Sequence, residues 1–442
     1  MLAQTGLQQR FMVCGSGRSS WPSSQYRVRL ASLATVVALL VPATAVAGEA
    51  LPDPCKELGA GYHAVPGLPA CAFFRADIKS DYRSRSTRNE ISVETSRTPA
   101  GPQLAYSLDR LRPDRPSARY LIEAKPLLRV GFLTDSGPVT ISFGVKYQRE
   151  SPPRRRNDPA NEFNRTGERL TIEHANIQFA GLALGIAPSF FDFTPSLSYT
   201  TLYASEQSVP LVAYTYKAGA TDFTLSIENG SYRRLSEAPW GGYVGKAAPD
   251  VVGAVRRHHD WGNIQVAGAL HTVRAFQPLA CCAPAAGEAL GWAAMAGVES
   301  WFDVAGMSGE ALLNLGVSRG ALSYIGATNY PADFALSRDG TVFMTTAQAI
   351  AASYAHWWTK EIRTVATFSG FRTALDTDTF SLHTEGLRLQ GALEFYPRIV
   401  PRRGLLLGAE VNYHDERVRG TGPWVANRYA STVLYVRQRF QP

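Results

Sequence analysis

After its first fifty residues, this 442-residue sequence has no apolar run long enough to cross a membrane as a helix. Such a helix needs about 20 consecutive apolar residues. The segment 279–298 is interrupted by Glu288, and the segment 347–358 is too short. The sequence therefore argues against a helical membrane protein. It leaves soluble folds and membrane β-barrels, in which apolar residues alternate with polar ones and the average hydropathy looks soluble.

The N-terminus carries the one exception. An apolar segment at 30–41 follows Arg27 and Arg29 and precedes the small residues at 45–47. A basic start, an apolar core of about a dozen residues and a small-x-small cleavage site are typical of a secretory signal peptide. We therefore expect residues 1–47 to be a signal peptide, with a retained membrane anchor as the alternative.

The sequence also lacks a strong charge of either sign. Its formal net charge of +8 becomes 8 − 4 = +4 when the signal region and its four arginines (Arg10, Arg18, Arg27 and Arg29) are removed. We find no basic run interleaved with aromatic residues, which is the pattern of nucleic-acid-binding proteins. We therefore expect no nucleic acid among its partners.

Cysteine is scarce, with five residues, and export places them in an oxidising compartment. Cys14 leaves with the signal peptide. Cys55 and Cys71 bracket a short loop that contains several glycines and prolines, and we expect a disulfide bond between them. Cys281 and Cys282 are adjacent in a predicted loop. The sequence leaves open whether these two form a bridge or stay reduced.

Alternation with a period of two residues runs through almost the whole chain. Over residues 139–147, β-branched and aromatic residues at every second position alternate with small and polar ones. Over residues 74–83, a fully charged face alternates with a mainly apolar one. Because successive side chains of a β-strand point to opposite faces, both patterns predict strands with one face in apolar surroundings.

There are about sixteen alternating segments. Short turns and long loops alternate as the connections between them. A soluble sandwich or propeller has no reason for this regularity, whereas bacterial outer-membrane barrels have an even strand number, short inner turns and long outer loops. The sequence therefore predicts an all-β protein. Its transmembrane antiparallel β-barrel would span residues 71–442, after an N-terminal disulfide loop at 48–70. We expect residues 84–117 and 319–345 to be loops.

Several segments also carry a family resemblance. Residues 172–182 read IEHANIQFAGL and lead through a second strand to the loop sequence SFFDF at 189–193. The segments IENGSYRR at 227–234, PDVV at 249–252 and WGNIQVAGALH at 261–271 follow. In their order and spacing, these motifs and the Cys55–Cys71 loop resemble the alphaproteobacterial general porins over most of residues 51–275.

The resemblance implies a homotrimeric channel of about sixteen strands, surrounded by outer-membrane lipid. Small hydrophilic solutes and ions would diffuse through it passively. The third outer loop, at 188–209 here, would fold back into the lumen and narrow it. The resemblance implies no catalytic site and no cofactor. His258 and His259 lie in a predicted turn without the ligand cluster of a metal site, so we expect no metal.

Such a channel works through fixed charges of both signs around a narrow aqueous path. From the inward faces of the predicted strands we expect a basic wall made of Arg75, Lys79, Arg119, Lys125, Arg129 and Lys146. Asp192 and Glu206 of the third loop would face this wall. The alternative is that each of these residues is an ordinary wetted lumen charge. Because the inward charges at 75–81 nearly cancel, the sequence leaves ion selectivity open.

Two other functions remain open from the sequence. The first is an outer-membrane barrel enzyme such as a lipid hydrolase, with Ser318 of the GVSRG motif at 316–320 as nucleophile and a histidine as base. That motif needs a strand-to-helix turn, and here a predicted strand leaves into a loop. The second is a plugged or substrate-specific barrel with a binding role, whose outer loops carry Trp240 and the arginines at 154–156.

Overall fold

The computed structural model describes residues 55–86, 89–98, 101–110, 118–151, 167–193, 197–199, 205–236, 242–245, 248–277, 285–327, 332–337, 339–397, 404–420 and 422–440. The chain divides into two units, Met1–Pro52 and Asp53–Pro442, and the fold below is that of the second. The predicted signal peptide, Cys14, Cys281, Cys282, Trp240 and the arginines at 154–156 lie outside the described residues. Within the described ranges, no helix is long and apolar enough to cross a membrane.

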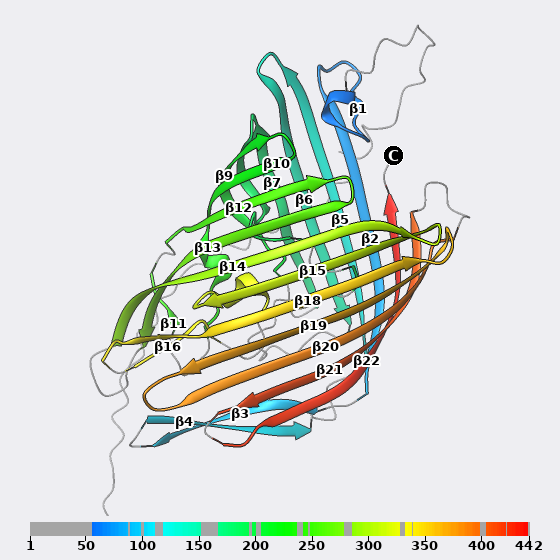
Figure 1. Ribbon diagram of the computed structural model, residues 1–442. Coiled ribbons are helices and arrows are strands. Elements are labelled where there is room, and N and C mark those ends of the chain that lie inside the picture. Colours follow the sequence, from blue (N-terminus) through cyan, green and yellow to red (C-terminus); the bar gives the residue numbers. More distant parts are fainter. Residues whose placement is uncertain are drawn as a thin grey trace, which may run out of the picture. The chain divides into compact units, whose positions relative to one another are not determined.

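Sixteen antiparallel strands form a closed barrel (Figure 1). Eighteen strands share one sheet, and two of them, β1 (His63–Ala64) and β11 (Gly242–Tyr243), are two-residue strands beside the ring. The remaining sixteen are β2 (Cys71–Arg85), β5 (Ala118–Thr134), β6 (Gly137–Ser151), β7 (Glu168–Phe179), β8 (Leu182–Pro188), β9 (Ser208–Ala218), β10 (Thr221–Glu228), β12 (Asp250–His259), β13 (Gly262–Gln277), β14 (Ala285–Val304), β15 (Met307–Arg319), β18 (Thr346–Trp357), β19 (Ile362–Asp376), β20 (Ser381–Phe395), β21 (Leu405–Arg419) and β22 (Val425–Phe440).

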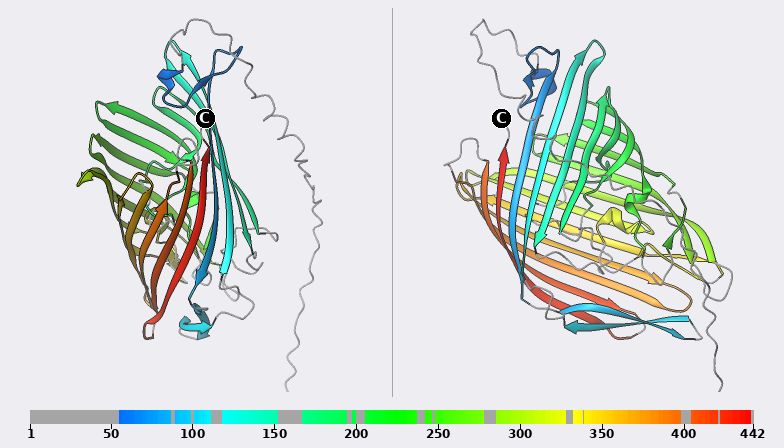
Figure 2. Two further views of the ribbon diagram at one scale, coloured as in Figure 1. Left: turned by 90° about the vertical axis from the view of Figure 1, so that its right-hand side faces the viewer. Right: turned by 180° about the vertical axis from the view of Figure 1, so that it is seen from behind.

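The first and last barrel strands close the ring. Strand β2 pairs with β5 on one side and with β22 on the other, where Ala76 lies opposite Phe440. Figures 1 and 2 show β22, in red, running beside β2, in blue. Closure leaves no free sheet edge, so the backbone groups along each strand find partners within the sheet. This is the condition for strands to cross a bilayer.

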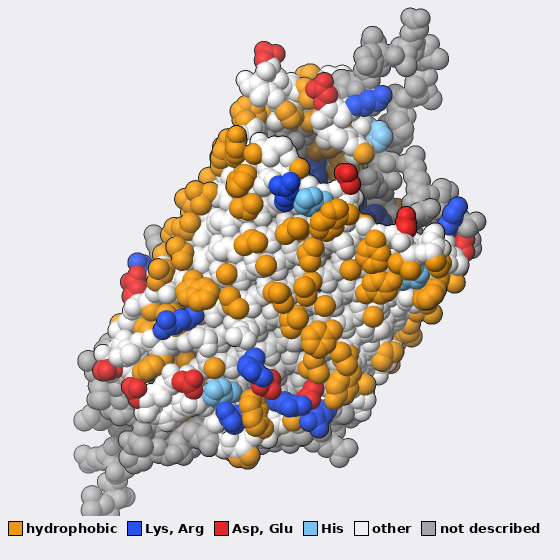
Figure 3. Space-filling model, in the orientation of Figure 1, with side chains coloured by type: hydrophobic (Ala, Val, Ile, Leu, Met, Phe, Trp, Pro, Cys, Tyr) orange, Lys and Arg blue, Asp and Glu red, His pale blue; other side chains and the backbone are white. Residues whose placement is uncertain are grey.

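The alternating sequence pattern is what allows the wall to separate two environments. Phe143, Leu225 and Leu393 point outward and are more than half exposed. Their neighbours along each strand point inward, as buried Ser142 and Ser226 do. Figure 3 shows hydrophobic side chains spread over the middle of the outer wall and charged ones gathered mainly toward its ends. An apolar band with polar margins is the outer surface of a transmembrane barrel.

Tight turns connect the strands at one end of the barrel. Between β7 and β8, Ala180 and Gly181 both have positive φ, 49° and 84°. This is the turn geometry that matches the twist of a hairpin. A Cβ atom on Gly181 would lie 2.4 Å from the carbonyl oxygen of Thr215, so only glycine fits there. Ala180 and Gly181 therefore form a tight turn between two paired strands.

Longer connections at the other end carry further elements. The segment between β2 and β5 holds a hairpin of β3 (Asn89–Thr98) and β4 (Gly101–Arg110), and that between β10 and β12 holds η4 (Gly230–Arg233). The segment between β15 and β18 holds η5 (Leu322–Ile325), β16 (Phe334–Leu336) and β17 (Val342–Met344). The expectation that 84–117 and 319–345 are plain loops was therefore wrong. Both segments contain short strands that pair only with each other. The strands were not recognised because the first segment is rich in arginine, serine and proline and the second contains glycine.

Two smaller expectations also need correction. His258 and His259 are the last residues of β12, because the turn that follows is shorter than the sequence suggests. The alternation of long and short connections breaks near the C-terminus. On the long-loop side, β19 and β20 are joined by residues 377–380 alone, whereas on the short-turn side residues 396–404 separate β20 from β21.

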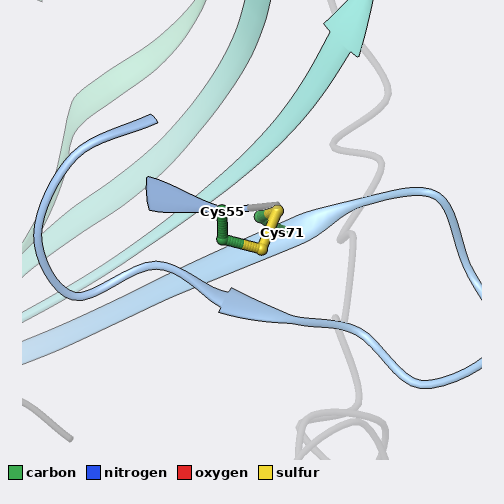
Figure 4. The surroundings of a disulfide bond; sticks show 2 residues. All are labelled: Cys55 and Cys71. Atoms are coloured by element: carbon green, nitrogen blue, oxygen red, sulfur yellow. A yellow bond between two sulfur atoms is a disulfide. The ribbon is translucent and has the colours of Figure 1, made fainter. Parts of the chain in front are cut away.

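The expected disulfide bond joins Cys55 to Cys71 (Figure 4). It ties the segment of η3 (Lys56–Leu58) and β1 to the first residue of β2. Buried Tyr62 packs with Phe73 and Leu127, which face the inside of the wall. The loop therefore lies against the inner surface of β2 and β5, at the short-turn end of the barrel.

Candidate functional site

A cavity of about 1350 Å³ lies inside the barrel. Its walls come from inward residues of the first and last strands and from the segment 189–207 between β8 and β9, which we call the third loop. The described parts of this loop are 189–193, 197–199 and 205–207. As expected from the resemblance, the loop enters the lumen.

The SFFDF segment attaches the loop to one wall. The hydroxyl of Ser189 donates to Glu228 of β10 over 2.8 Å, and the amide of Phe190 donates to the same carboxylate over 3.2 Å. The side-chain amide of Gln265 on β13 donates to the carbonyl groups of Phe191 and Asp192, each over 3.2 Å. Three backbone groups and the hydroxyl of Ser189 therefore hold the start of the loop.

A buried arginine fixes the same segment from a neighbouring loop. Arg233 of η4 is almost completely buried and donates to Asp192 over 3.1 Å. Its guanidinium lies over the ring of Tyr324, 4.4 Å from the centroid, and that ring meets Phe191 edge-on at 4.8 Å. The other carboxylate oxygen of Asp192 accepts from the amide of Gln207 over 2.6 Å. Asp192 thus joins the two ends of the third loop to the wall.

The middle of the loop contacts the opposite wall. The ring of Tyr199 stacks on Tyr435 of β22, with centroids 3.8 Å apart. Its hydroxyl donates to Asp81 of β2 over 3.1 Å, and its amide donates to Glu410 of β21 over 3.2 Å. Strands β12 and β22 have seven strands between them in either direction around the ring. The guanidinium of Arg256, on β12, lies over the ring of Phe193, 5.1 Å from its centroid. The loop therefore contacts β12 through Phe193 and β22 through Tyr199, and spans the lumen from one side to the other.

Burial and the nearby carboxylate of Asp81 raise the pKa of Tyr199 well above the ordinary value for tyrosine. The phenol is therefore neutral at physiological pH and acts as a hydrogen-bond donor. Lys79 lies over the same ring, with its amine 5.5 Å from the centroid. The loop's contact with the far wall is thus aromatic, hydrogen-bonded and next to a cation.

Lysines and glutamates form a ladder on the wall that the cavity faces. Lys79 and Lys125 lie 3.4 and 3.7 Å from Glu123, and Lys125 and Lys146 lie 3.4 and 2.8 Å from Glu173. Three ammonium groups therefore share two carboxylates. The inward faces of β2, β5, β6 and β7 supply these side chains, as the alternation of the sequence predicts.

Six of the eight residues expected at the narrow region line this cavity: Lys79, Arg119, Lys125, Lys146, Asp192 and Glu206. The structure places the other two beside the disulfide loop. Arg75 lies 3.3 Å from Asp77, and Arg129 lies over the ring of Phe73 at 5.6 Å. Both point inward from the short-turn end of their strands, away from the third loop.

Sequence reasoning missed the residues that hold the loop. Arg233 lies in a motif noted for its resemblance, but nothing in the sequence joins it to Asp192. Tyr199 and Tyr435 are separated by more than half of the chain, and only closure of the ring brings them together. Alternation does identify Glu123 as inward-facing, although it does not reveal that Glu123 and Glu173 form ion pairs with the lysines.

A second buried network docks the outer loops against the wall. Asp333, fully buried before β16, accepts from the amides of Leu235 and Leu322 over 2.7 and 2.9 Å. It also accepts from the hydroxyl of Tyr243 over 2.7 Å. Burial raises the pKa of Asp333 and also that of Tyr243. The hydroxyl of Tyr243 lies 3.0 Å from Nε2 of His271, so this network reaches the barrel wall.

The residues of the possible hydrolase site lie apart from such an arrangement. Ser318 is a buried, inward-facing residue within β15, and it is paired with Ala347 of the neighbouring strand β18. Its hydroxyl has no hydrogen-bond partner among the described residues. Only the four-residue 3-10 helix η5 follows this strand, and Ser318 lies within the strand and not at the turn. His258 contacts Asp222 and Asn263 over 3.1 and 2.8 Å, and His259 stacks on Trp261. No group of three candidate metal ligands occurs among the described residues.

Known proteins provide the comparison. The family model described as the Porin subfamily matches residues 143–395. The outer membrane channel DcaP of Acinetobacter baumannii has a similar structure, with a TM-score of 0.60 and 13% sequence identity over 84% of this chain and 97% of that one. No curated protein sequence matches this chain.

Weaker structural similarities reach two further outer-membrane proteins. One is OmpT of Vibrio cholerae in its trimer form, with a TM-score of 0.46 and 9% identity over 84% of this chain and all of that one (100%). The other is OmpF of Salmonella typhi, with a TM-score of 0.44 and 8% identity over 84% and 98% of the two chains. We draw nothing from these two. The family match covers more than half of the sequence, and DcaP supports the barrel fold. The chain therefore belongs to the porin family and is an outer-membrane channel for small solutes.

Proposed function

We propose that this protein is an open, water-filled pore through which small hydrophilic solutes and ions diffuse passively. The observation that carries the proposal is the position of the third loop. Phe193 near its start and Tyr199 in its middle contact opposite walls of the barrel, and a lined cavity of about 1350 Å³ remains beside them. A loop that narrows a barrel without filling it sets a size limit for diffusion.

The constriction in this proposal lies between the third loop and the lysine–glutamate ladder. Lys79, Lys125 and Lys146 face the cavity from one side, and Glu206 faces it from the loop. Arg119 extends the basic wall. We assign Arg75 and Arg129 to the inner mouth, because they lie beside the disulfide loop. Asp192 anchors the loop through Arg233.

The remaining parts of the proposal concern the mature protein in its membrane. Residues 1–47 would be removed as a signal peptide, and the barrel would then assemble as a homotrimer in outer-membrane lipid. It would belong with the alphaproteobacterial general porins, whose motifs its own sequence resembles. Sedimentation in detergent of matched density tests the trimer. A mass of one subunit would contradict it.

The enzyme alternative has less support. A hydrolase nucleophile must be exposed at a sharp turn beside a base. Ser318 is instead buried within a strand. A plugged barrel is also less favoured, because the described part of the third loop leaves the cavity beside it.

Swelling of liposomes tests the pore directly. Proteoliposomes containing the folded protein are diluted into isotonic solutions of a pentose, a hexose, a disaccharide and a trisaccharide. We expect swelling rates that fall steeply as the sugar grows, because the third loop narrows the path. Liposomes with heat-denatured protein are the control. Folded protein that admits none of the sugars would contradict an open pore.

A further inference from the structure

In several ion pairs of the lumen, the cationic side chain is more exposed to water than the carboxylate. In the ion pair of Arg119 with Glu150, 2.6 Å apart, the arginine side chain is 37% exposed and the glutamate 4%. In the pair of Arg83 with Asp81, 2.7 Å apart, the values are 27% and 2%. The carboxylate thus lies against the wall and the cation above it. Water in the pore meets the cationic partner.

In the lysine–glutamate ladder, too, the cation is more exposed than the carboxylate. Lys79 is more exposed than Glu123, and both Lys125 and Lys146 are more exposed than Glu173. Arg437 of β22 continues the strip and covers Asp77. Two described pairs of the lumen have the reverse order: Glu310 is more exposed than Arg363, and Asp192 is more exposed than Arg233. The strip of exposed cations therefore runs over β2, β5, β6 and β22.

The third loop adds little negative charge opposite this strip. Asp192 is occupied by Arg233 and by the amide of Gln207. Glu206 lines the cavity and interacts electrostatically with Lys125. Among the described residues that line the cavity there are ten lysines and arginines and seven aspartates and glutamates. The surplus is three positive charges when histidine is neutral.

A narrow aqueous path between low-dielectric walls concentrates ions of the sign opposite to its fixed charge. Both the count of charges and their exposure favour anions here. We propose that the pore is anion-selective and takes small inorganic and organic anions along the strip of Lys79, Arg83, Arg119, Lys125, Lys146 and Arg437. This inference rests on the proposed function, since selectivity requires conduction.

The reversal potential in a potassium chloride gradient across a planar bilayer tests the inference. The wild-type channel should show a chloride permeability greater than that of potassium. The double variant Lys79→Gln, Lys146→Gln removes two exposed cations while each carboxylate keeps a partner. Glu173 retains Lys125 at 3.4 Å, and Glu123 retains Lys125 and also Gln148, at 2.8 Å. The reversal potential of this variant should shift toward the potassium equilibrium potential.

The matched control is Arg372→Gln. Arg372 is also paired with a carboxylate, Glu385 at 3.0 Å, but it points outward and is 71% exposed. It should leave the reversal potential unchanged. Current steps with potassium favoured over chloride would overturn anion selectivity. A double variant that behaves like wild type would overturn its assignment to this strip of cations. Both outcomes would leave the pore standing. Folded protein that gives no current would overturn the proposed function and the selectivity with it.

Discussion

Tyr199 of the third loop stacks on Tyr435 of the last barrel strand, with ring centroids 3.8 Å apart and ring planes 13° from parallel. The contact joins the middle of a lumen loop to the wall opposite its base. Aromatic pairs contribute about 0.5–1.5 kcal/mol beyond the area they bury. The hydroxyl of Tyr199 adds a hydrogen bond to Asp81. These two interactions set the position of the loop across the pore.

Tyr199→Ala should widen the pore, because it removes both the stacking and the hydrogen bond to Asp81. We expect a larger single-channel conductance than in wild type. Tyr199→Phe keeps the ring and should give a conductance between the two. Tyr413→Ala, on the outer face of the neighbouring strand β21, is the control and should leave conductance unchanged. Equal conductance in all four proteins would show that this contact does not position the loop.

Arg233→Ala should destabilise the barrel far more than Arg372→Ala. Removal of one partner from a buried ion pair costs about 3–5 kcal/mol, whereas an exposed pair contributes about 0–1 kcal/mol. Arg233 is buried against Asp192, and Arg372 is exposed beside Glu385. The temperature at which the folded band converts to the unfolded band in detergent gels measures the difference. If Arg233→Ala does not fold, Asp192→Asn provides the comparison. Similar temperatures for the buried-site and surface variants would contradict the anchor.

Tyr199 should remain protonated in alkaline solution in which exposed tyrosines ionise. Burial, and then the charge of Asp81, raise its pKa. A raised pKa means that the stability gained from the neutral phenol is complete below the ordinary tyrosine value and is lost as the pH rises through the raised one. Absorbance at the tyrosinate band should therefore show the same ionisation for wild type and Tyr199→Phe up to about pH 10. An additional tyrosine titrating in wild type within this range would contradict the burial of the hydroxyl.

Asp333→Ala should release the docked outer loops without opening the barrel. The change leaves the amides of Leu235 and Leu322 without their acceptor, and a buried unpaired group costs about 1–3 kcal/mol. Trypsin should then cleave after Arg234, next to the released amide, while the barrel stays resistant. Asp333→Asn keeps one acceptor oxygen and should be cleaved more slowly. Resistance of Asp333→Ala equal to wild type would show that the loops dock without Asp333.

Much of the barrel was predictable because its chemistry is local. Alternation over a strand such as β6 reports which side chains face each environment, and the inward positions of Lys79 and Lys125 follow from it. The disulfide between Cys55 and Cys71 also followed from a short spacing. The prediction failed where two strands pair with each other outside the barrel sheet. An example is the β3–β4 hairpin, where arginine and proline residues gave the segment the composition of an ordinary loop.

The contacts that shape the pore were less predictable because they join distant parts of the chain. Asp192 lines the cavity, but nothing in the sequence shows that its carboxylate is paired with the buried Arg233. Alternation places Arg129 inward but says nothing of its height along the barrel, and it lies toward the short-turn end, over the ring of Phe73. The alternation along a strand therefore predicts which charged side chains face the lumen. Only the folded barrel shows which of them come into contact.

Single-channel recording in a planar lipid bilayer tests the central claim most directly. The mature protein, refolded in detergent and verified as a heat-modifiable barrel, is added to one side at low concentration. We predict discrete, stable current steps at moderate voltage, grouped in threes if the protein inserts as a trimer. A bilayer that stays silent in the presence of this verified barrel would contradict the account of an open pore narrowed by the third loop.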